Sequence, residues 1–506
     1  MFKTFGFIFL STLMLSACGP SSDESEPARS SILSPCPGFA ETGEVPAVAN
    51  AECGYLSVLE NPGDSEGRNI ELYIQRLPAI SSASEQDPLF IIVGGPGQAA
   101  TEFAPQLAYL FSDVRKKRDI VLLDQRGTGK SNPLDCDVER EQDFTLTDRQ
   151  VQLQSLTDMR TCIETVDADL RFYTTPYAMD DLDKVRKVLG YQQINLWGVS
   201  YGTRAALEYA RRFPRNTRTM ILDASAPVQM MIPFYMESDA DAALASLLDD
   251  CDKDESCHKT FGETQAALEA VLKDLKGDGR LLKALHPSTQ VETEVRINAK
   301  AFARVLRMAL YSRELAPLIP LMIQKSSAGD FQLFLSIALL ASSSMEEGIS
   351  ELMHLAVLCN EDMPLLKKRQ AEGELPAQNK ALLAADSLAQ MESSCALVPS
   401  APVPDIYYET IVSDVPTLIM SGAADPATPP YWGEQVLEGL SRGKHLVAEG
   451  GHHGISSQGC VPDLMSAFIA AGSVQKLDVQ CVDNIRRTPL FIDVMGPEMQ
   501  GDALSD

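Results

Sequence analysis

Short apolar runs alternate with amphipathic stretches along most of this chain. Residues 89–93 (Leu-Phe-Ile-Ile-Val) are continuously apolar, as expected for a strand buried on both faces of a sheet. Residues 179–189 instead carry apolar side chains at helical spacing. The strand-like pattern recurs at residues 120–123, 194–197, 220–222, 417–420 and 446–448. This alternation predicts an α/β fold in which helices flank a mostly parallel central sheet.

Two regions depart from this rhythm. Residues 55–59 and 70–77 predict an antiparallel hairpin before the parallel strands. Between residues 228 and 403 the strand-like runs disappear, and helical patterns such as 264–275 and 301–311 replace them. A helical block inserted between two strands predicts a cap above the C-terminal edge of the sheet, where functional loops converge. The expected parts are a core at 36–227 and 404–485, a helical cap at 228–403 and a tail at 486–506.

Residues 198–202 read Gly-Val-Ser-Tyr-Gly and lie between a strand-like run and a helical run. A serine at such a sharp strand-to-helix turn is the nucleophile elbow of α/β-hydrolases. We expect Gly198 and Gly202 to leave room for the close approach of neighbouring backbone. The hydroxyl of Ser200 would then stand clear of the sheet, as a catalytic nucleophile requires.

A serine hydroxyl needs a nearby base to act as a nucleophile at neutral pH. In the chain order of these hydrolases, an acid follows a late strand and a histidine follows the last strand. Asp425 follows the penultimate strand-like run, and His452 and His453 follow the last one. The predicted triad is therefore Ser200, Asp425 and one of these two histidines. Asp223, after an earlier strand, is the alternative acid, although we expect it to hold a loop together.

The loop after the strand at residues 89–93 reads Gly-Gly-Pro-Gly at positions 94–97. In this fold such a loop supplies one of the two amides that stabilise the oxyanion. Pro96 has no amide hydrogen, so the donor must be a glycine, and we choose Gly95. The other expected donor is the amide of Tyr201, next to the nucleophile. The same glycines are also compatible with a plain tight turn.

Composition excludes several function classes. The 506 residues carry a net charge of −27, which argues against nucleic acid as a partner. Residues 127–131 (Gly-Thr-Gly-Lys-Ser) resemble the end of a phosphate-binding loop, but Asp124 stands where the first glycine is required. The acidic residues 249–255 lack the ligand spacing of a calcium loop. We expect no metal and no cofactor, and we interpret His354 as a satisfied core residue.

The first residues resemble a bacterial lipoprotein signal. Lys3 precedes an apolar stretch, and Leu-Ser-Ala-Cys at positions 15–18 predicts that Cys18 is lipidated. Gly19 after the cysteine favours the outer membrane over the inner one, with the protein facing the periplasm. Residues 19–35 are polar and predict a flexible tether. No other segment has the length of apolar sequence that a membrane-spanning helix needs.

The chain has eleven cysteines, so ten remain when Cys18 is set aside. An even number in an exported protein predicts five disulfides, and the spacings do not match a zinc site. Pairing between nearest neighbours gives Cys36–Cys53, Cys136–Cys162, Cys251–Cys257, Cys359–Cys395 and Cys460–Cys481.

These motifs together resemble the prolyl iminopeptidase and tripeptidyl aminopeptidase family of α/β-hydrolases. The resemblance rests on residues 94–97, 124–131, 198–202 and 425–430, and residues from 405 onward are similar to the C-terminal part of tripeptidyl aminopeptidases. It implies that Ser200 is the nucleophile and Asp425 the orienting acid. The family's base precedes a glycine, which favours His453 over His452. Val93 stands where the family has a histidine, so strict prolyl specificity is not implied.

The resemblance also implies that a carboxylate in the cap binds the α-ammonium group of the substrate. Glu361 is the candidate, and an ordinary surface carboxylate is the alternative. The sequence therefore predicts a lipid-anchored serine aminopeptidase that removes short N-terminal units from peptides through an acyl-enzyme. The alternatives are a carboxylesterase with the same machinery and a non-catalytic envelope binding protein that kept the fold.

Overall fold

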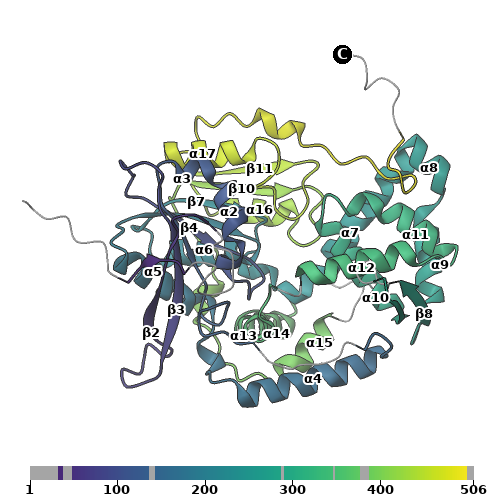
Figure 1. Cartoon of the computed structure of the whole chain (residues 1–506), viewed down its shortest axis with the longest axis horizontal. Coiled ribbons are helices and arrows are strands. Elements are labelled where there is room, and N and C mark those ends of the chain that lie inside the picture. The colour runs from purple at the N-terminus through teal and green to yellow at the C-terminus, as the bar shows by residue number, and fades with distance from the viewer. Residues whose placement is uncertain are drawn as a thin grey trace, which may run out of the picture.

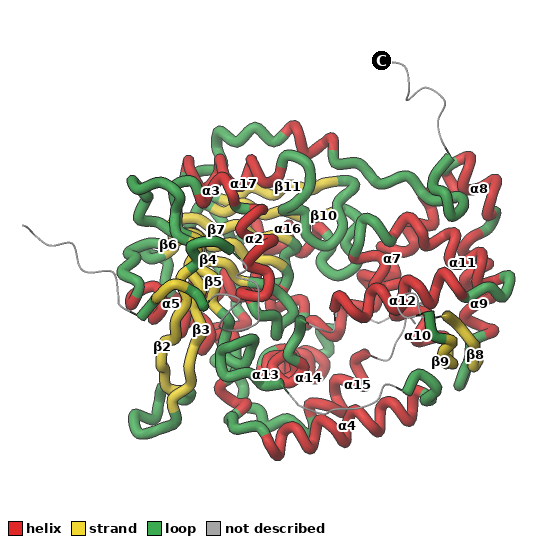
Figure 2. The backbone as a smooth tube through the Cα atoms, viewed as in Figure 1, coloured by secondary structure: helices red, strands yellow, loops and turns green. Residues whose placement is uncertain are grey.

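A nine-stranded sheet forms the centre of the computed structural model, which describes residues 32–37, 48–135, 143–285, 290–345, 348–375 and 387–498 (Figures 1 and 2). The strands, in spatial order, are β1 (Ser34–Pro35), β2 (Glu52–Leu59), β3 (Asn69–Leu77), β5 (Ile120–Leu123), β4 (Leu89–Ile92), β6 (Ile194–Val199), β7 (Thr217–Asp223), β10 (Thr417–Gly422) and β11 (Gly443–Ala448). From β5 to β11 every neighbouring pair is parallel, whereas β1, β2 and β3 pair antiparallel. The expected hairpin and the mostly parallel sheet of an α/β-hydrolase are confirmed.

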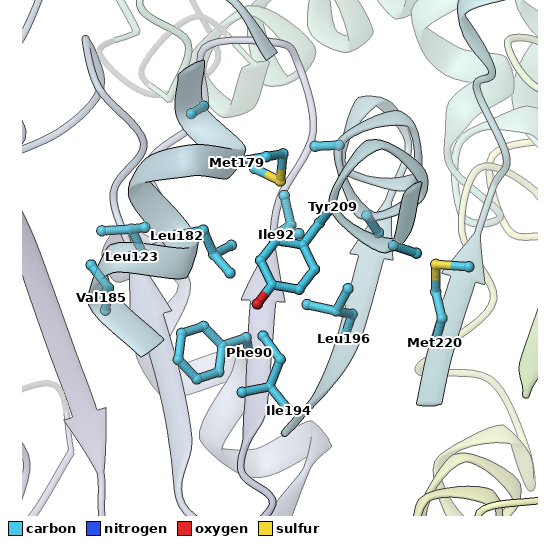
Figure 3. Close-up of a cluster of buried hydrophobic side chains, with 14 of the residues drawn as sticks. Phe90, Ile92, Leu123, Met179, Leu182, Val185, Ile194, Leu196, Tyr209 and Met220 are labelled. Atoms are coloured by element: carbon cyan, nitrogen blue, oxygen red, sulfur yellow. The ribbon is translucent and has the colours of Figure 1, made fainter. Parts of the chain in front are cut away.

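Each face of the sheet is covered by its own set of helices. Phe90 and Ile92 of β4 pack toward one face, and their neighbours Leu89 and Ile91 pack toward the other, because successive side chains of a strand alternate. Figure 3 shows the first cluster between the sheet and the helices above it. The helices are α5 (Thr175–Val188), α6 (Tyr201–Arg212) and α16 (Pro430–Leu437) on the first face, and α2 (Ala104–Leu110), α3 (Ser112–Arg115) and α17 (Val461–Ala471) on the second.

The segment between β7 and β10 is mainly helical and lies to the right of and below the sheet in Figure 1. It contains α7 (Ile232–Lys253), α8 (Glu255–Phe261), α9 (Thr264–Asp274), α10 (Ala299–Tyr311), α11 (Ile319–Ser327), α12 (Gln332–Met345), α13 (Glu351–Asn360), α14 (Asp362–Glu372) and α15 (Ser387–Cys395). A two-stranded hairpin of β8 (Arg280–Leu285) and β9 (Glu292–Ile297), which the sequence analysis missed, interrupts these helices. Short 3₁₀ turns occupy Ala100–Phe103, Leu170–Phe172, Val228–Met230, Ala316–Leu318, Asp405–Tyr408 and Gln480–Asn484.

Helix α4 (Asp148–Thr165) precedes the elbow in the chain but lies with the cap. Its Met159 packs in one cluster with Leu352 of α13. At its first residue, Asp148 accepts a hydrogen bond of 2.6 Å from Asn298, which caps α10. The cap therefore takes a helix from the segment that the sequence analysis placed wholly in the core.

The chain after residue 485 joins the core to the cap. Arg487 forms an ion pair with Asp250 of α7 and donates a hydrogen bond of 2.9 Å to Ser246. The amide of Phe491 donates to the carbonyl of Pro317, also in the cap. Figure 1 shows this yellow segment running from the sheet toward α8. The described part of the predicted tail thus connects the core to the cap through contacts with cap residues.

Four of the five expected disulfides are confirmed: Cys36–Cys53, Cys251–Cys257, Cys359–Cys395 and Cys460–Cys481. Cys162 is also disulfide-bonded, and its expected partner Cys136 lies outside the described residues. Disulfides of this number are typical of proteins that mature outside the cytoplasm. The signal, Cys18 and most of the tether also lie outside the described residues. Within the described ranges, no helix combines the length and the apolar character that crossing a bilayer demands.

Candidate active site

Ser200 sits at a strained turn between β6 and α6. Its backbone adopts φ 56° and ψ −127°, a conformation that non-glycine residues rarely take. A Cβ at Gly198 would lie 2.4 Å from the carbonyl oxygen of Gly202, and a Cβ at Gly202 would lie 2.1 Å from that of Ile92. Both positions therefore require glycine, as expected, and the sharp strand-to-helix turn is confirmed.

Asp425 and His453 meet at the C-terminal ends of β10 and β11. The Nδ1 atom of His453 lies 2.9 Å and 3.0 Å from the two carboxylate oxygens of Asp425. The amides of Ala427 and Thr428 and the hydroxyl of Thr428 donate to the same carboxylate at 2.7–2.9 Å. These donors fix the carboxylate, which in turn sets the orientation of the imidazole ring.

The electrostatics of this pair favour charge on both partners. Although burial alone would raise the pKa of Asp425, the nearby His453 and the donors from Thr428 hold that pKa below its usual value. Although burial alone would lower the pKa of His453, the Asp425 carboxylate raises it above its usual value. An imidazole held in this way is a strong enough base to take a proton from a hydroxyl and is stabilised once protonated.

The neighbouring His452 points elsewhere. Its Nδ1 atom lies 2.7 Å from the carbonyl oxygen of Leu310, in cap helix α10. Burial is the main reason that its pKa is lowered. Of the two candidate histidines, His453 is therefore the one in contact with Asp425.

Asp223 connects the serine turn to the histidine loop. Its carbonyl oxygen accepts the amide of Ser200 at 2.9 Å. Its carboxylate accepts the amides of Ile455 and Ser456 at 2.8–3.0 Å and is fully buried. This confirms the expectation that Asp223 holds a loop together, while Asp425 is the acid that contacts His453.

The loop at residues 94–97 lies against the serine. A Cβ at Gly94 would come within 2.9 Å of the Ser200 Cβ. Gly95 has φ 103° and lines a cavity of about 780 Å³ between core and cap. The amide of Tyr201 is the first of α6, so it has no partner within the helix. Among the described residues, the Ser200 hydroxyl forms no hydrogen bond, and catalytic hydrogen bonds are often long before substrate binds.

The expected role of Glu361 does not fit the structure. The side chain has no exposed surface, and its carboxylate accepts hydrogen bonds from the amide and the hydroxyl of Thr175 at 2.6 and 2.9 Å and from Tyr407. Arg204, one turn after the nucleophile, lies 3.7 Å away and also pairs with Asp362. A substrate ammonium group cannot reach a carboxylate that is buried and saturated in this way. Glu361 belongs instead to a charged network between α6 and the cap.

Two residues beside His453 escaped the sequence analysis. Thr428 contacts both Asp425 and His453, and its place three residues after an aspartate is the signal of an Asx turn that could have revealed it. Tyr311 ends cap helix α10 and packs edge-on against the His453 ring. Nothing in the sequence marks Tyr311, because more than a hundred residues separate it from the histidine.

The segment at residues 124–131 and two further histidines have structural partners. The carboxylate of Asp124 accepts the amides of Thr101 and Lys130 at 2.9 and 3.1 Å, so the segment at 124–131 organises its own loop. His354 lies 3.0 Å from the carbonyl oxygen of Pro96, and His445 lies 2.9 Å from Ser421, as expected for satisfied side chains.

Comparison with known proteins gives two family matches. The model of the α/β hydrolase fold matches residues 87–254, and the model of TAP-like proteins matches residues 380–481. The tripeptidyl aminopeptidase of Streptomyces coelicolor is 26% identical over 476 residues, covering 87% of this chain and 84% of that protein. The serine protease Hip1 of Mycobacterium tuberculosis is 24% identical over 479 residues, covering 88% and 90%. A probable proline iminopeptidase of Streptomyces coelicolor is 30% identical over 139 residues, covering 28% and 33%.

Both family matches include part of the site, since the first contains Ser200 and the second contains Asp425 and His453. The chain is therefore a serine hydrolase with the α/β-hydrolase fold, related to the tripeptidyl aminopeptidases and proline iminopeptidases.

Proposed function

We propose that this protein is an exported serine aminopeptidase that releases short N-terminal units from peptides through an acyl-enzyme. One observation carries the proposal: the buried Asp425 carboxylate holds the His453 imidazole at the edge of the sheet where the strained Ser200 turn lies. Nucleophilic serine catalysis needs a base that a third group orients.

In the proposed reaction, Nε2 of His453 accepts the proton of the Ser200 hydroxyl as Oγ attacks the scissile carbonyl carbon. The amides of Tyr201 and Gly95 donate to the oxyanion of the tetrahedral intermediate. His453 then gives its proton to the departing amine, and the N-terminal unit remains as an ester on Ser200. Water, deprotonated by His453, attacks this ester, and the serine recovers its proton when the acid product leaves. Asp425 keeps the proton on Nδ1 throughout.

The cap supports the choice of short peptides as substrates. A cavity of about 780 Å³ between core and cap has the size of sites that hold small ligands, and folded proteins cannot enter such a space. The similarity to a tripeptidyl aminopeptidase and to a serine protease also favours a peptide over a simple ester as the substrate.

Covalent labelling tests the machinery. We expect a fluorophosphonate probe to label the wild type and to spare Ser200→Ala. His453→Gln should lower kcat by about 10⁴-fold or more, whereas His452→Gln, the matched neighbour, should stay close to the wild type. A wild-type protein that the probe does not label would favour the non-catalytic binding protein.

Substrate pairs test the peptidase assignment. We expect an aminoacyl-naphthylamide with a free α-amine to be cleaved much faster than its N-acetylated form. Mass spectrometry of a panel of short peptides would then give the length of the unit released. Faster cleavage of simple esters, with no dependence on the amine, would indicate a carboxylesterase instead.

We also propose that Cys18 carries the lipid anchor and that the enzyme faces the periplasm from the outer membrane. The Leu-Ser-Ala-Cys sequence supports this assignment. A clickable fatty-acid analogue should label the wild type in cells and not Cys18→Ala, which should appear in the soluble fraction. Equal labelling of both proteins would refute the anchor without affecting the proposed chemistry.

A further inference from the structure

Two arginines of cap helix α10 line the cavity between core and cap. Arg304 and Arg307 are three residues apart, so they lie on the same face of the helix. In the described part of the chain, neither takes part in an ion pair or a side-chain hydrogen bond. The Nη1 atom of Arg307 is moreover buried without any partner.

Other interior arginines have carboxylate or carbonyl partners, although Nη2 of Arg126 is, like Nη1 of Arg307, buried without a hydrogen-bond partner among the described residues. Arg126 contacts Asp181 at 2.7 Å, and Arg204 contacts Asp362 at 2.8 Å. Arg296, which lines the same cavity, donates to the carbonyl oxygen of Thr145 at 2.7 Å. The chain has 70 acidic and 43 basic residues, so carboxylates to pair with Arg307 are plentiful. A buried guanidinium nitrogen without an acceptor is costly, and because Arg307 lines the cavity, a ligand that enters the cavity can supply the missing acceptor.

Two acidic side chains of the cavity are engaged by other residues. Asp143 and Asp148 also line it, and both have other partners. Asp143 accepts hydrogen bonds from Thr145, and Asp148 accepts one from Asn298 and forms an ion pair of 3.8 Å with Lys300 of α10. Within the described ranges, neither of these two carboxylates is paired with Arg304 or Arg307.

Two observations place Arg307 near the proposed catalytic residues, one from its position in α10 and one from the cavity that it lines. It lies four residues, about one turn, before Tyr311, whose ring packs against His453. The cavity that Arg307 lines also reaches Gly95, in the loop that packs against Ser200. A short peptide in this cavity can therefore reach the loop beside Ser200 while one of its carboxylates lies at Arg307.

We propose that Arg307, assisted by Arg304, binds a carboxylate of the peptide substrate. The planar guanidinium matches a carboxylate with two parallel hydrogen bonds, which gives both affinity and orientation. The carboxylate is either the free C-terminus of a short peptide or an acidic side chain. This inference rests on the proposed peptidase function and adds a substrate class to it: short peptides with a negative charge beyond the scissile bond.

Binding to the inactive Ser200→Ala protein tests the inference without requiring turnover. Isothermal titration would compare a tetrapeptide with its C-terminal amide, and a glutamate-containing amidated peptide with its glutamine counterpart. Hydrogen bonds to charged groups predict at least about tenfold tighter binding of the carboxylate form in one of these pairs. The pair that shows the difference identifies the source of the carboxylate. No difference in either pair would overturn the inference.

The preference should depend on the arginine itself. In Ser200→Ala with Arg307→Gln, we expect the two members of the discriminated pair to bind equally, and Arg307→Lys should retain part of the difference. Arg280→Gln is the matched control, because Arg280 is a half-exposed cap arginine paired with Asp274 outside the cavity. If Arg307→Gln does not fold, Arg304→Gln should still reduce the preference. An unchanged preference in folded Arg307→Gln would refute the role.

The two proposals fail separately. If the fluorophosphonate probe fails to label the wild type, the catalytic proposal is refuted. The ratio of the affinities within each peptide pair would still decide the role of Arg307. Normal labelling and peptide cleavage with no carboxylate preference would refute only the role of Arg307.

Discussion

The Tyr311 ring packs edge-on against the His453 imidazole, with ring centroids 4.9 Å apart. Tyr311 belongs to the cap, whereas His453 belongs to the core. The cap therefore contributes directly to the site, because one of its side chains packs against the proposed catalytic base. The Tyr311 ring restricts rotation of the imidazole about its side-chain bonds, while Asp425 holds its Nδ1 atom.

Replacing Tyr311 tests whether its ring positions the His453 imidazole. Tyr311→Phe keeps the ring, so we expect its kcat to stay close to the wild type. Tyr311→Ala frees the imidazole, and a displacement of about 1 Å costs up to about 10²-fold in kcat. Steady-state kinetics on a neutral peptide amide would measure both, and equal activity of the two variants would contradict a positioning role.

Asp425→Asn removes the charge that orients His453. In a triad of this type the change lowers kcat by about 10⁴-fold, because the amide favours the wrong tautomer of the imidazole. The fold should persist, since the asparagine oxygen can still accept the amides of Ala427 and Thr428. Asp223→Asn is the comparison: Asp223 holds the loop rather than the imidazole, so its main effect should be on thermal stability. Greater loss of kcat in Asp223→Asn with retained stability would reverse the two assignments.

The pH dependence of kcat/KM tests the interaction between Asp425 and His453. His453 must be neutral to accept a proton, and its pKa in the folded protein is raised above 6.5 by Asp425 against the effect of burial. Activity should therefore rise with pH through a midpoint above 6.5. In Asp425→Asn the residual activity should have its midpoint at lower pH, because the charge that stabilises the imidazolium is gone. An unshifted midpoint would show that another group controls the profile.

Glu361 should matter for stability and not for substrate binding. Burial raises its pKa to about 7 despite the nearby Arg204, so its contribution to stability is full below pH 4.5 and is lost as the pH rises through about 7. Glu361→Gln should flatten this pH dependence of the melting temperature and leave KM unchanged. Glu361→Ala leaves buried donors without an acceptor and should destabilise the protein by about 3 kcal/mol. A large rise of KM in Glu361→Gln would restore the role in substrate binding.

Glycine at the serine turn is a strict requirement. Gly198→Ala and Gly202→Ala would each place a methyl group within 2.4 Å of a backbone oxygen that cannot move aside. We expect both proteins to be recovered in insoluble form. At Gly348 the nearest atom would be 3.8 Å from an added methyl group, so Gly348→Ala should remain soluble. Soluble, active Gly202→Ala would contradict the close contact with Ile92.

The sequence determined the sheet and the serine turn because both depend on local chemistry. Continuous apolar runs such as residues 89–93 indicate burial on two faces, and the glycines at 198 and 202 reveal a backbone that passes close to its neighbours. The order of Ser200, Asp425 and the late histidines is also a property of the sequence. The missed hairpin β8–β9 shows the limit of this approach, because charged residues interrupt the apolar ones in both strands and neither has the continuous apolar run of the central sheet.

Only the tertiary structure decided which groups meet. His452 and His453 are adjacent in an irregular loop, and their directions follow from the Leu310 carbonyl and the Asp425 carboxylate, which come from distant parts of the chain. Tyr311 and Arg307 resemble any other residues of an amphipathic helix until that helix is packed on the core. Glu361 stands in a motif that implied exposure to substrate, yet packing buried it against Thr175 and Tyr407. Periodicity encodes which face of an element is buried, but not which partner that face meets, and the chemistry of this site depends on the partners.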